Sequence, residues 1–260
     1  MELIEESYVL RQVIRDPLLG FGIGSILRKQ FVPRQDAYGV CVDHEYGSPG
    51  RIQEDTVRCF GADLTALQTA ELTGLNRNTV NRFYRAVRER ILEACEAQRP
   101  LFGIVEVDES YFGARRVKGK AGRGASGKTT VFGIFERQGK VLTEIVLDCS
   151  RPSLQGIIRG KVDPNTIIHS DGWPGYQGLV DLGYGHFRVD HNSNEFVRKA
   201  VHINGIEGFW GIAKVRLAKF KGLPKHTFHL HLKETEWRYN HRHDDKYKIL
   251  LSYLRNKPLS

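Results

Sequence analysis

The spacing of hydrophobic and polar positions changes near residue 100 of the chain. From about 53 to 98, apolar residues recur at helical spacing between short polar breaks, which predicts a small all-α region. After Pro100, short runs rich in β-branched and aromatic residues predict strands at 101–107, 129–136, 141–148, 166–169 and 187–190. Helical spacing returns at 152–161, 176–182, 204–220 and 227–254. This order of elements predicts an α/β domain with a mixed sheet flanked by helices.

The first fifty residues follow neither pattern. They contain a glycine-rich apolar stretch and end in Tyr46-Gly47-Ser48-Pro49-Gly50, a segment typical of a turn or linker. Apart from an initial helix, we assign no structure to them. The sequence therefore predicts three parts: an unassigned extension at 1–50, a helical region at 51–99 and an α/β domain at 100–260.

The helical region contains a segment with the spacing of a helix-turn-helix. Thr65 is suited to an N-cap, and Gly74 falls where the chain must turn with a positive φ. Val80 and Phe83 then return to the core, and a second helix is expected from about Arg77 to Arg90. The outer face of that helix carries side chains that suit phosphates and base edges: Arg77, Asn78, Asn81, Arg82, Arg85 and Arg88. The alternative is a helical hairpin with a solvated basic face.

Composition and charge narrow the class of protein. A hydrophobic fraction of 40% in 260 residues excludes a wholly disordered chain and a small disulfide-stabilised domain. The 39 Lys and Arg residues exceed the 30 Asp and Glu residues, and this excess is typical of proteins that bind nucleic acid or an anionic membrane. No apolar run is long enough to cross a membrane, and the acidic start is not a signal peptide, so we expect a cytoplasmic protein. The four cysteines lie far apart and are expected to be reduced.

Three acidic residues follow predicted elements of the α/β domain in a distinctive order. Asp108 is expected to end the first strand, Asp171 follows the fourth strand, and Glu207 lies on the helix after the fifth. Carboxylates that converge from such positions can hold two Mg²⁺ ions about 4 Å apart, which suits in-line phosphoryl transfer. Lys214 follows Glu207 by about two helical turns and shares its face of the helix.

The segments around these acids resemble one enzyme family. The segments VEVDESYFG, IIHSDGWPGY and HINGIEGFWGIAK are similar to the motifs of DDE transposases of bacterial insertion sequences, within the ribonuclease-H-like superfamily. The resemblance implies that Asp108, Asp171 and Glu207 are the catalytic and metal-binding triad, with two Mg²⁺ ions or Mn²⁺ as cofactor. It also implies that Lys214 contacts DNA.

The third motif contains a second candidate. Some relatives are described with asparagine as the third residue, and Asn204 lies one helical turn before Glu207. We favour Glu207 because an anionic ligand holds Mg²⁺ better than a neutral amide does. Asn204 is retained as a further metal ligand or as a helix cap. The chain also departs from the family, since many relatives begin with a zinc ribbon of paired cysteines and this one has none.

A basic loop separates the first two predicted strands. Residues 113–128 contain six basic residues, five glycines and no acid, so the segment can follow a phosphate backbone. Its basic residues are Arg115, Arg116, Lys118, Lys120, Arg123 and Lys128. The alternative is a solvated hairpin tip that tolerates charge.

Aromatic residues accompany the acids. Trp173 and Tyr176 follow Asp171, while Phe209 and Trp210 follow Glu207. These side chains can stack on an unpaired base near a cut in DNA, or they can pack in the domain core. The sequence alone leaves both interpretations open.

The expected function is therefore that of an insertion-sequence transposase. Such an enzyme binds double-stranded DNA at the element's terminal repeats and at the target, cleaves it, and transfers the freed 3′ end. A homo-oligomer on DNA is expected because two ends must be brought together. The alternatives are a ribonuclease-H-like nuclease that does not join ends, and a non-catalytic DNA-binding protein derived from a transposase.

Overall fold

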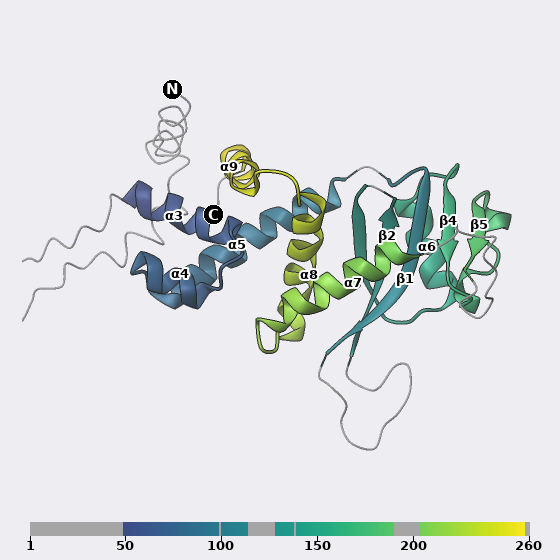
Figure 1. Ribbon diagram of the computed structural model, residues 1–260, viewed down its shortest axis with the longest axis horizontal. Helices are drawn as coiled ribbons and strands as arrows, with labels where there is room; N and C mark the ends of the chain where they lie inside the picture. Colours follow the sequence, from purple (N-terminus) through teal and green to yellow (C-terminus); the bar gives the residue numbers. More distant parts are fainter. Residues whose placement is uncertain (1–48, 99, 114–127, 138, 190–202, 258–260) are drawn as a thin grey trace, which may run out of the picture. The chain divides into compact units, whose positions relative to one another are not determined.

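The computed structural model describes residues 49–98, 100–113, 128–137, 139–189 and 203–257 (Figure 1). The expected initial helix and most of the basic loop lie outside these residues. The chain divides into two compact units, one made of residues 1–91 with 243–260 and the other of residues 92–242. The division differs from the expected one at the C-terminal end, because residues 243–260 group with the first unit and not with the α/β domain.

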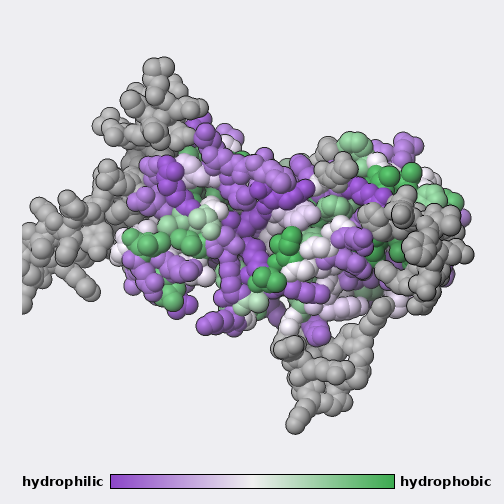
Figure 2. All heavy atoms as spheres, viewed as in Figure 1, coloured by the Kyte–Doolittle hydropathy of each residue, from purple (hydrophilic) through white to green (hydrophobic). Residues whose placement is uncertain are grey.

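The described part of the first unit is helical. Its helices are α3 (Pro49–Gly61), α4 (Ala66–Thr73), the first part of α5 (Arg77–Glu96), and α9 (Lys246–Asn256). Thr65 caps α4 through a capping box with Gln68, and Gly74 ends the helix in the left-handed conformation at φ 69°. The predicted start and turn of the helix pair are therefore confirmed. Figure 2 shows hydrophobic residues at the surface of α4, where Leu67 and Leu72 are exposed.

The core of this unit forms around α5. Val80 and Phe83 are buried, as expected, and so is Tyr84. The Tyr84 ring meets Phe60 of α3 edge-on at 4.8 Å between centroids, and its hydroxyl hydrogen-bonds with Thr69 of α4 at 2.6 Å. These contacts fix α3 and α4 against one side of α5.

The second unit is built on a mixed sheet of five strands. The strands are β1 (Ile104–Phe112), β2 (Thr129–Glu136), β3 (Val141–Val146), β4 (Ile167–Ser170) and β5 (Gly185–Arg188). Their order in the sheet is β3-β2-β1-β4-β5. The β3–β2 and β2–β1 pairs are antiparallel, and the β1–β4 and β4–β5 pairs are parallel. The helical elements of the unit are α6 (Arg151–Lys161), η1 (Pro174–Tyr176), η2 (Val180–Leu182), α7 (Asn204–Ala218) and α8 (Lys225–Asn240).

Helices cover both faces of the sheet, so the predicted mixed sheet flanked by helices is confirmed (Figure 1). On one face, Leu154 and Ile158 of α6 pack against Val105 and Val107 of β1. On the other face, the hydrophobic side chains of α7 and α8 pack against β1, β2 and β3. Alternate residues of β1 therefore point to two separate cores.

Two predicted helices differ from the structure. The segment 176–182 forms two short 3-10 turns instead of one helix, because Gly178 and Gly183 have φ values of 79° and 90°. The segment 227–254 divides into α8 and α9. Asp245 begins the second of these helices, since its carboxylate accepts hydrogen bonds from the backbone N–H groups of Tyr247 and Lys248.

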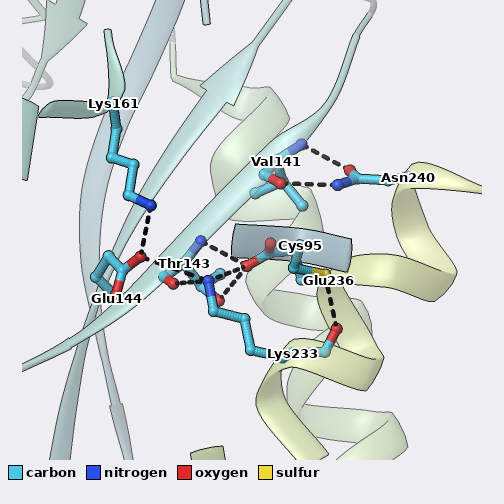
Figure 3. Close-up of polar contacts among 8 residues, drawn as sticks. All are labelled: Cys95, Val141, Thr143, Glu144, Lys161, Lys233, Glu236 and Asn240. Carbon is cyan, nitrogen blue, oxygen red and sulfur yellow. Dashed lines mark hydrogen bonds and ion pairs between the residues drawn. The ribbon is translucent and has the colours of Figure 1, made fainter. Parts of the chain in front are cut away.

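Polar side chains of α8 cover the edge strand β3 (Figure 3). Asn240 pairs with both backbone groups of Val141, at 2.7 and 2.9 Å. One turn earlier, Glu236 accepts hydrogen bonds from the backbone N–H and the hydroxyl of Thr143, at 2.8 and 2.7 Å. Lys233 donates to the Thr143 carbonyl at 2.6 Å and pairs with Glu236 at 3.0 Å. The helix thus satisfies backbone groups that an edge strand otherwise leaves open.

None of the helices in the described ranges is long and apolar enough to cross a membrane. Among the same residues, Cys59, Cys95 and Cys149 form no disulfide. Cys95 is buried beside α8, where its thiol lies 3.8 Å from the carbonyl oxygen of Lys233 and burial raises its pKa.

Candidate active site

The register of two parallel strands brings Asp108 and Asp171 together. The last pair of the β1–β4 ladder joins Val107 to Ser170, and the two acids are the next residue on each segment. The sequence predicted that Asp108 ends the first strand, and this was wrong. The strand β1 continues to Phe112 because it stays paired with β2. The site therefore opens where the parallel partner ends and the antiparallel partner continues.

A glycine opposite Asp108 lets α7 approach the sheet. Gly133 of β2 is the partner of Asp108 in the antiparallel ladder. A Cβ atom on Gly133 would lie 2.4 Å from Cζ2 of Trp210 and 2.8 Å from Cδ1 of Ile206, both on α7. Only a residue without a side chain fits between strand and helix here. This close packing brings the first turn of α7, with Glu207, towards Asp108.

A buried carboxylate holds the start of α7. Oε2 of Glu106 accepts hydrogen bonds from the backbone N–H groups of Gly205 and Ile206, at 2.8 and 3.0 Å. A carboxylate is favourable at this position because the first N–H groups of a helix lack partners within the helix. Gly205 is required as well, since a Cβ atom there would lie 2.2 Å from Cε1 of Phe135.

Arg137 compensates the buried charge of Glu106. Its Nε donates to Oε1 of Glu106 at 3.0 Å, and its Nη2 lies 2.9 Å from Nδ1 of His169 on β4. Glu106 and Arg137 were missed in the sequence. The signal available was the alternation in Val105-Glu106-Val107-Asp108, which puts Glu106 on the same side of β1 as Asp108.

The negative charges of Asp171 and Glu207 act on the carboxyl group of Asp108 and affect its pKa. The pKa of Asp108 is raised from 3.8 to about 6, mainly by burial and also by the charges of Asp171 and Glu207. The backbone N–H of Glu109 and the indole of Trp210 act in the opposite direction. The Trp210 Nε1 is buried with no partner in good hydrogen-bond geometry among the described residues, but it is close enough to the Asp108 carboxyl to lower the pKa.

The donor set fits a hard divalent cation. Two aspartates, a glutamate and the amide of Asn204 offer oxygen ligands of the kind that Mg²⁺ prefers. A cation here would relieve the repulsion that raises the pKa of Asp108. Within the described ranges, no three His, Cys, Asp or Glu side chains converge closely enough to hold an ion as they stand.

The loop that carries Asp171 is held by three contacts. Its Oδ1 accepts the backbone N–H of Trp173 at 2.9 Å, and the Trp173 indole donates to the carbonyl of Cys149 at 3.1 Å. The Tyr176 hydroxyl donates to Glu109 of β1. Burial raises the pKa of Tyr176, so the hydroxyl keeps its proton and this bond to β1.

The expected DNA contacts of the second unit lie partly on α7. Asn204, Glu207 and Lys214 are all exposed on this helix. Figure 2 shows hydrophobic residues among the hydrophilic ones over α7, where Ile212 and Val215 are exposed. Of the basic loop, Lys128 is described and exposed. The remaining residues expected to contact DNA there lie outside the described residues: Arg115, Arg116, Lys118, Lys120 and Arg123.

The helix-turn-helix candidates lie on α5. Five of them are exposed along the helix: Arg77, Asn78, Asn81, Arg82 and Arg85. The expectation for Arg88 was wrong, because this residue is only 8% exposed. Its guanidinium lies over the rings of Phe60 and Tyr84, at 5.5 and 5.7 Å from their centroids. Arg88 therefore faces the core of the first unit.

The chain is similar in sequence to transposases. Residues 100–240 match the family described as the ISXO2-like transposase domain. The chain is 44% identical over 101 residues to a protein of Haemophilus influenzae named "Uncharacterized transposase-like protein", a match that covers 39% of this chain and 81% of the relative.

Two solved structures show more distant similarity. The catalytic core of BIV integrase is 16% identical, with a TM-score of 0.34, over 59% of this chain and 97% of that one. The catalytic domain of Mos1 transposase, whose structure contains raltegravir and Mn, is 14% identical, with a TM-score of 0.28, over 65% and 90% of the two chains.

Proposed function

Because the chain belongs to the ISXO2-like transposase family, we propose that it cleaves DNA at element ends and transfers the freed strand by in-line phosphoryl transfer. Asp108, Asp171 and Glu207 are the catalytic carboxylates in this proposal. The observation that carries it is the parallel register, which makes Asp108 and Asp171 neighbours at the end of the β1–β4 ladder. The effect of the Glu207 charge on Asp108 supports the inclusion of the third acid.

The same residues are proposed to hold two Mg²⁺ ions, with Mn²⁺ as an alternative. When bound, such ions supply positive charge for the attacking and leaving oxygens of the scissile phosphate. The protein supplies three carboxylates and holds them in place. Glu106 fixes the start of α7, and the Trp173 N–H fixes the carboxylate of Asp171. These contacts fix the backbone that carries the acids, and the carboxylates still have to converge to hold a cation.

We favour Glu207 over Asn204 as the third catalytic residue. Both are exposed in the first turn of α7. Glu207 carries a negative charge that raises the pKa of Asp108, whereas Asn204 offers only a neutral amide oxygen to a cation. Glu207→Gln is therefore expected to abolish DNA cleavage, whereas Asn204→Ala is expected to lower the affinity for Mg²⁺.

DNA binding is proposed for two separate surfaces. On α7, Lys214 is exposed together with Glu207, so it can contact a phosphate next to the cut. On α5, the exposed residues from Arg77 to Arg85 suit the duplex that carries the terminal repeat. The net charge of +9 adds attraction for any polyanion. A homo-oligomer on DNA follows from the need to hold two ends at once.

The experiment is strand cleavage of a labelled duplex that carries the repeats flanking this reading frame. The wild type is compared with Asp171→Asn in Mg²⁺, and joining of the freed 3′ end to a second duplex is followed in the same reaction. Cleavage and joining by the wild type alone are expected. Cleavage without joining would indicate a nuclease, and binding without cleavage by either protein would indicate a non-catalytic DNA-binding protein.

A further inference from the structure

The four aromatic residues that accompany the acids differ in exposure. Tyr176 and Phe209 are fully buried, and Trp210 is 4% exposed, so these three belong to the core. Trp173 is 36% exposed, although it has the largest apolar side chain of any residue type. The structure therefore separates Trp173, which is only partly buried, from the other three.

The exposed indole is fixed in place. Its Nε1 donates to the carbonyl oxygen of Cys149 at 3.1 Å. Its Cδ1 lies against Gly175, where a Cβ atom would be only 2.9 Å away from it. The backbone N–H of Trp173 is held by Asp171 at 2.9 Å. The first two contacts hold the ring and the third holds its backbone, so the indole loses little conformational entropy when a ligand binds to it.

The exposed ring lies close in the chain to the candidate site. Gly172, the residue between Asp171 and Trp173, adds no side chain between the Asp171 carboxylate and the indole. The indole is also tied through its backbone to the carboxylate of Asp171, which the proposed function assigns to the cutting site. A flat, rigid and partly exposed aromatic surface beside a phosphodiester-cleaving carboxylate matches the requirement for stacking a nucleobase.

We infer that Trp173 is a binding site for an unpaired nucleobase next to the scissile phosphate. This inference rests on the proposed function of Asp171. A base adjacent to the cut leaves the duplex and stacks on the indole, which offsets part of the cost of unpairing. The contact is independent of base identity, because every base has a π-face. Stacking thus favours DNA that is already frayed, bulged or mispaired at that position.

The test is equilibrium binding of the full chain to two short duplexes in Ca²⁺. One duplex is fully paired, and the other carries a single bulged 2-aminopurine. The wild type is expected to prefer the bulged duplex and to quench the fluorescence of its 2-aminopurine by stacking. Trp173→Ala is expected to reduce the affinity for the bulged duplex by about 5- to 100-fold while it leaves the paired duplex unaffected.

Two variants complete the design. Trp173→Phe keeps an aromatic face without the N–H donor to Cys149, and is expected to retain part of the preference. Phe102→Ala removes another exposed aromatic, which is 56% exposed and lies just before β1, six residues before Asp108 in the chain, and is expected to keep the full preference. A melting curve for each variant confirms that it folds.

The inference is overturned if Trp173→Ala folds and still prefers and quenches the bulged duplex as the wild type does. Failure of the proposed function has a different signature. If the wild type cleaves DNA while Trp173→Ala keeps the preference, only the stacking site is wrong. If the wild type neither binds nor cleaves DNA, the proposed function fails and the stacking site fails with it.

Discussion

Asp108 of β1 and Asp171, the residue after β4, each come one position after the last parallel pair of their two strands. Their proximity is therefore fixed by backbone register and not by side-chain choice. The charge of Asp171 contributes to the raised pKa of Asp108, which is the expected result of two acids that lie side by side just beyond the last parallel pair. The site therefore combines repulsion between acidic side chains with a rigid sheet, and this repulsion affects both the stability of the fold and its affinity for Mg²⁺.

Asp108→Asn is expected to stabilise the fold at neutral pH without metal. The folded-state pKa of about 6 lies above the ordinary value of 3.8, so the folded chain holds more protons than the unfolded chain between these values. Stability of the wild type therefore falls as pH rises through this window. The variant should gain roughly 1 to 3 kcal/mol at pH 7 in EDTA, measured by urea unfolding. A variant no more stable than the wild type would disprove this electrostatic cost.

Mg²⁺ is expected to raise the melting temperature of the wild type, and less so as pH falls through about 6. The reason is that protons compete with the cation for the carboxylate of Asp108. A thermal-shift titration at several pH values measures the effect. Asp171→Asn should respond much less than the wild type. An equal response of both proteins would show that the stabilising ion binds elsewhere.

Gly133→Ala is expected to destabilise the second unit by about 1 to 3 kcal/mol. The added Cβ would lie 2.4 Å from the Trp210 ring, which is buried and cannot move aside. The matched control is Gly156→Ala on α6, where a Cβ meets nothing within 4 Å. Alanine favours a helix over glycine, so the control should be neutral or stabilising. Urea denaturation compares the two, and equal stability would contradict the close packing of α7 on β2.

Glu106→Gln is expected to reduce both stability and cleavage. It removes the negative charge that pairs with Arg137 at 3.0 Å and caps α7 through the N–H groups of Gly205 and Ile206. Loss of a largely buried charge partner costs several kcal/mol, on the order of 3. Glu89→Gln, which breaks the exposed pair with Arg85, should change stability by less than about 1 kcal/mol.

The cleavage rate separates the positioning role of Glu106 from a purely structural one. At a temperature where Glu106→Gln is fully folded, its rate should rise with Mg²⁺ concentration beyond the point where the wild type saturates, because Glu207 is less well held. A variant that saturates at the same Mg²⁺ concentration would limit Glu106 to a role in stability.

The succession of strands and helices along the chain, and the positions of the three acids in it, could be predicted because local patterns in the sequence determine them. The β2 strand has the predicted bounds, and each acid follows an apolar run or opens a helix. The end of β1 could not be predicted, because pairing with β2 extends the strand beyond the apolar run to Phe112. Local hydrophobicity does not report which of two partners continues along a strand.

Contacts between distant segments explain most of what the sequence did not reveal. Glu106 caps a helix that begins about a hundred residues later, and no local pattern marks such a pair. The polar residues of α8 suggest a solvated helix, yet Lys233 and Glu236 are buried because β3 needs partners for its free edge. Arg88 has helical spacing with the basic face of α5 but lies over aromatic rings instead.

The most direct test of the proposed metal site is whether Mn²⁺ restores DNA cleavage to a variant with a sulfur ligand at position 171. Asp171→Cys replaces a hard oxygen ligand with a soft sulfur, which binds Mn²⁺ much better than Mg²⁺. We predict that this variant is inactive in Mg²⁺ and recovers cleavage in Mn²⁺, while Asp171→Asn stays inactive in both. Cleavage by Asp171→Cys at the wild-type rate in Mg²⁺ would contradict the claim that Asp171 holds a catalytic metal ion.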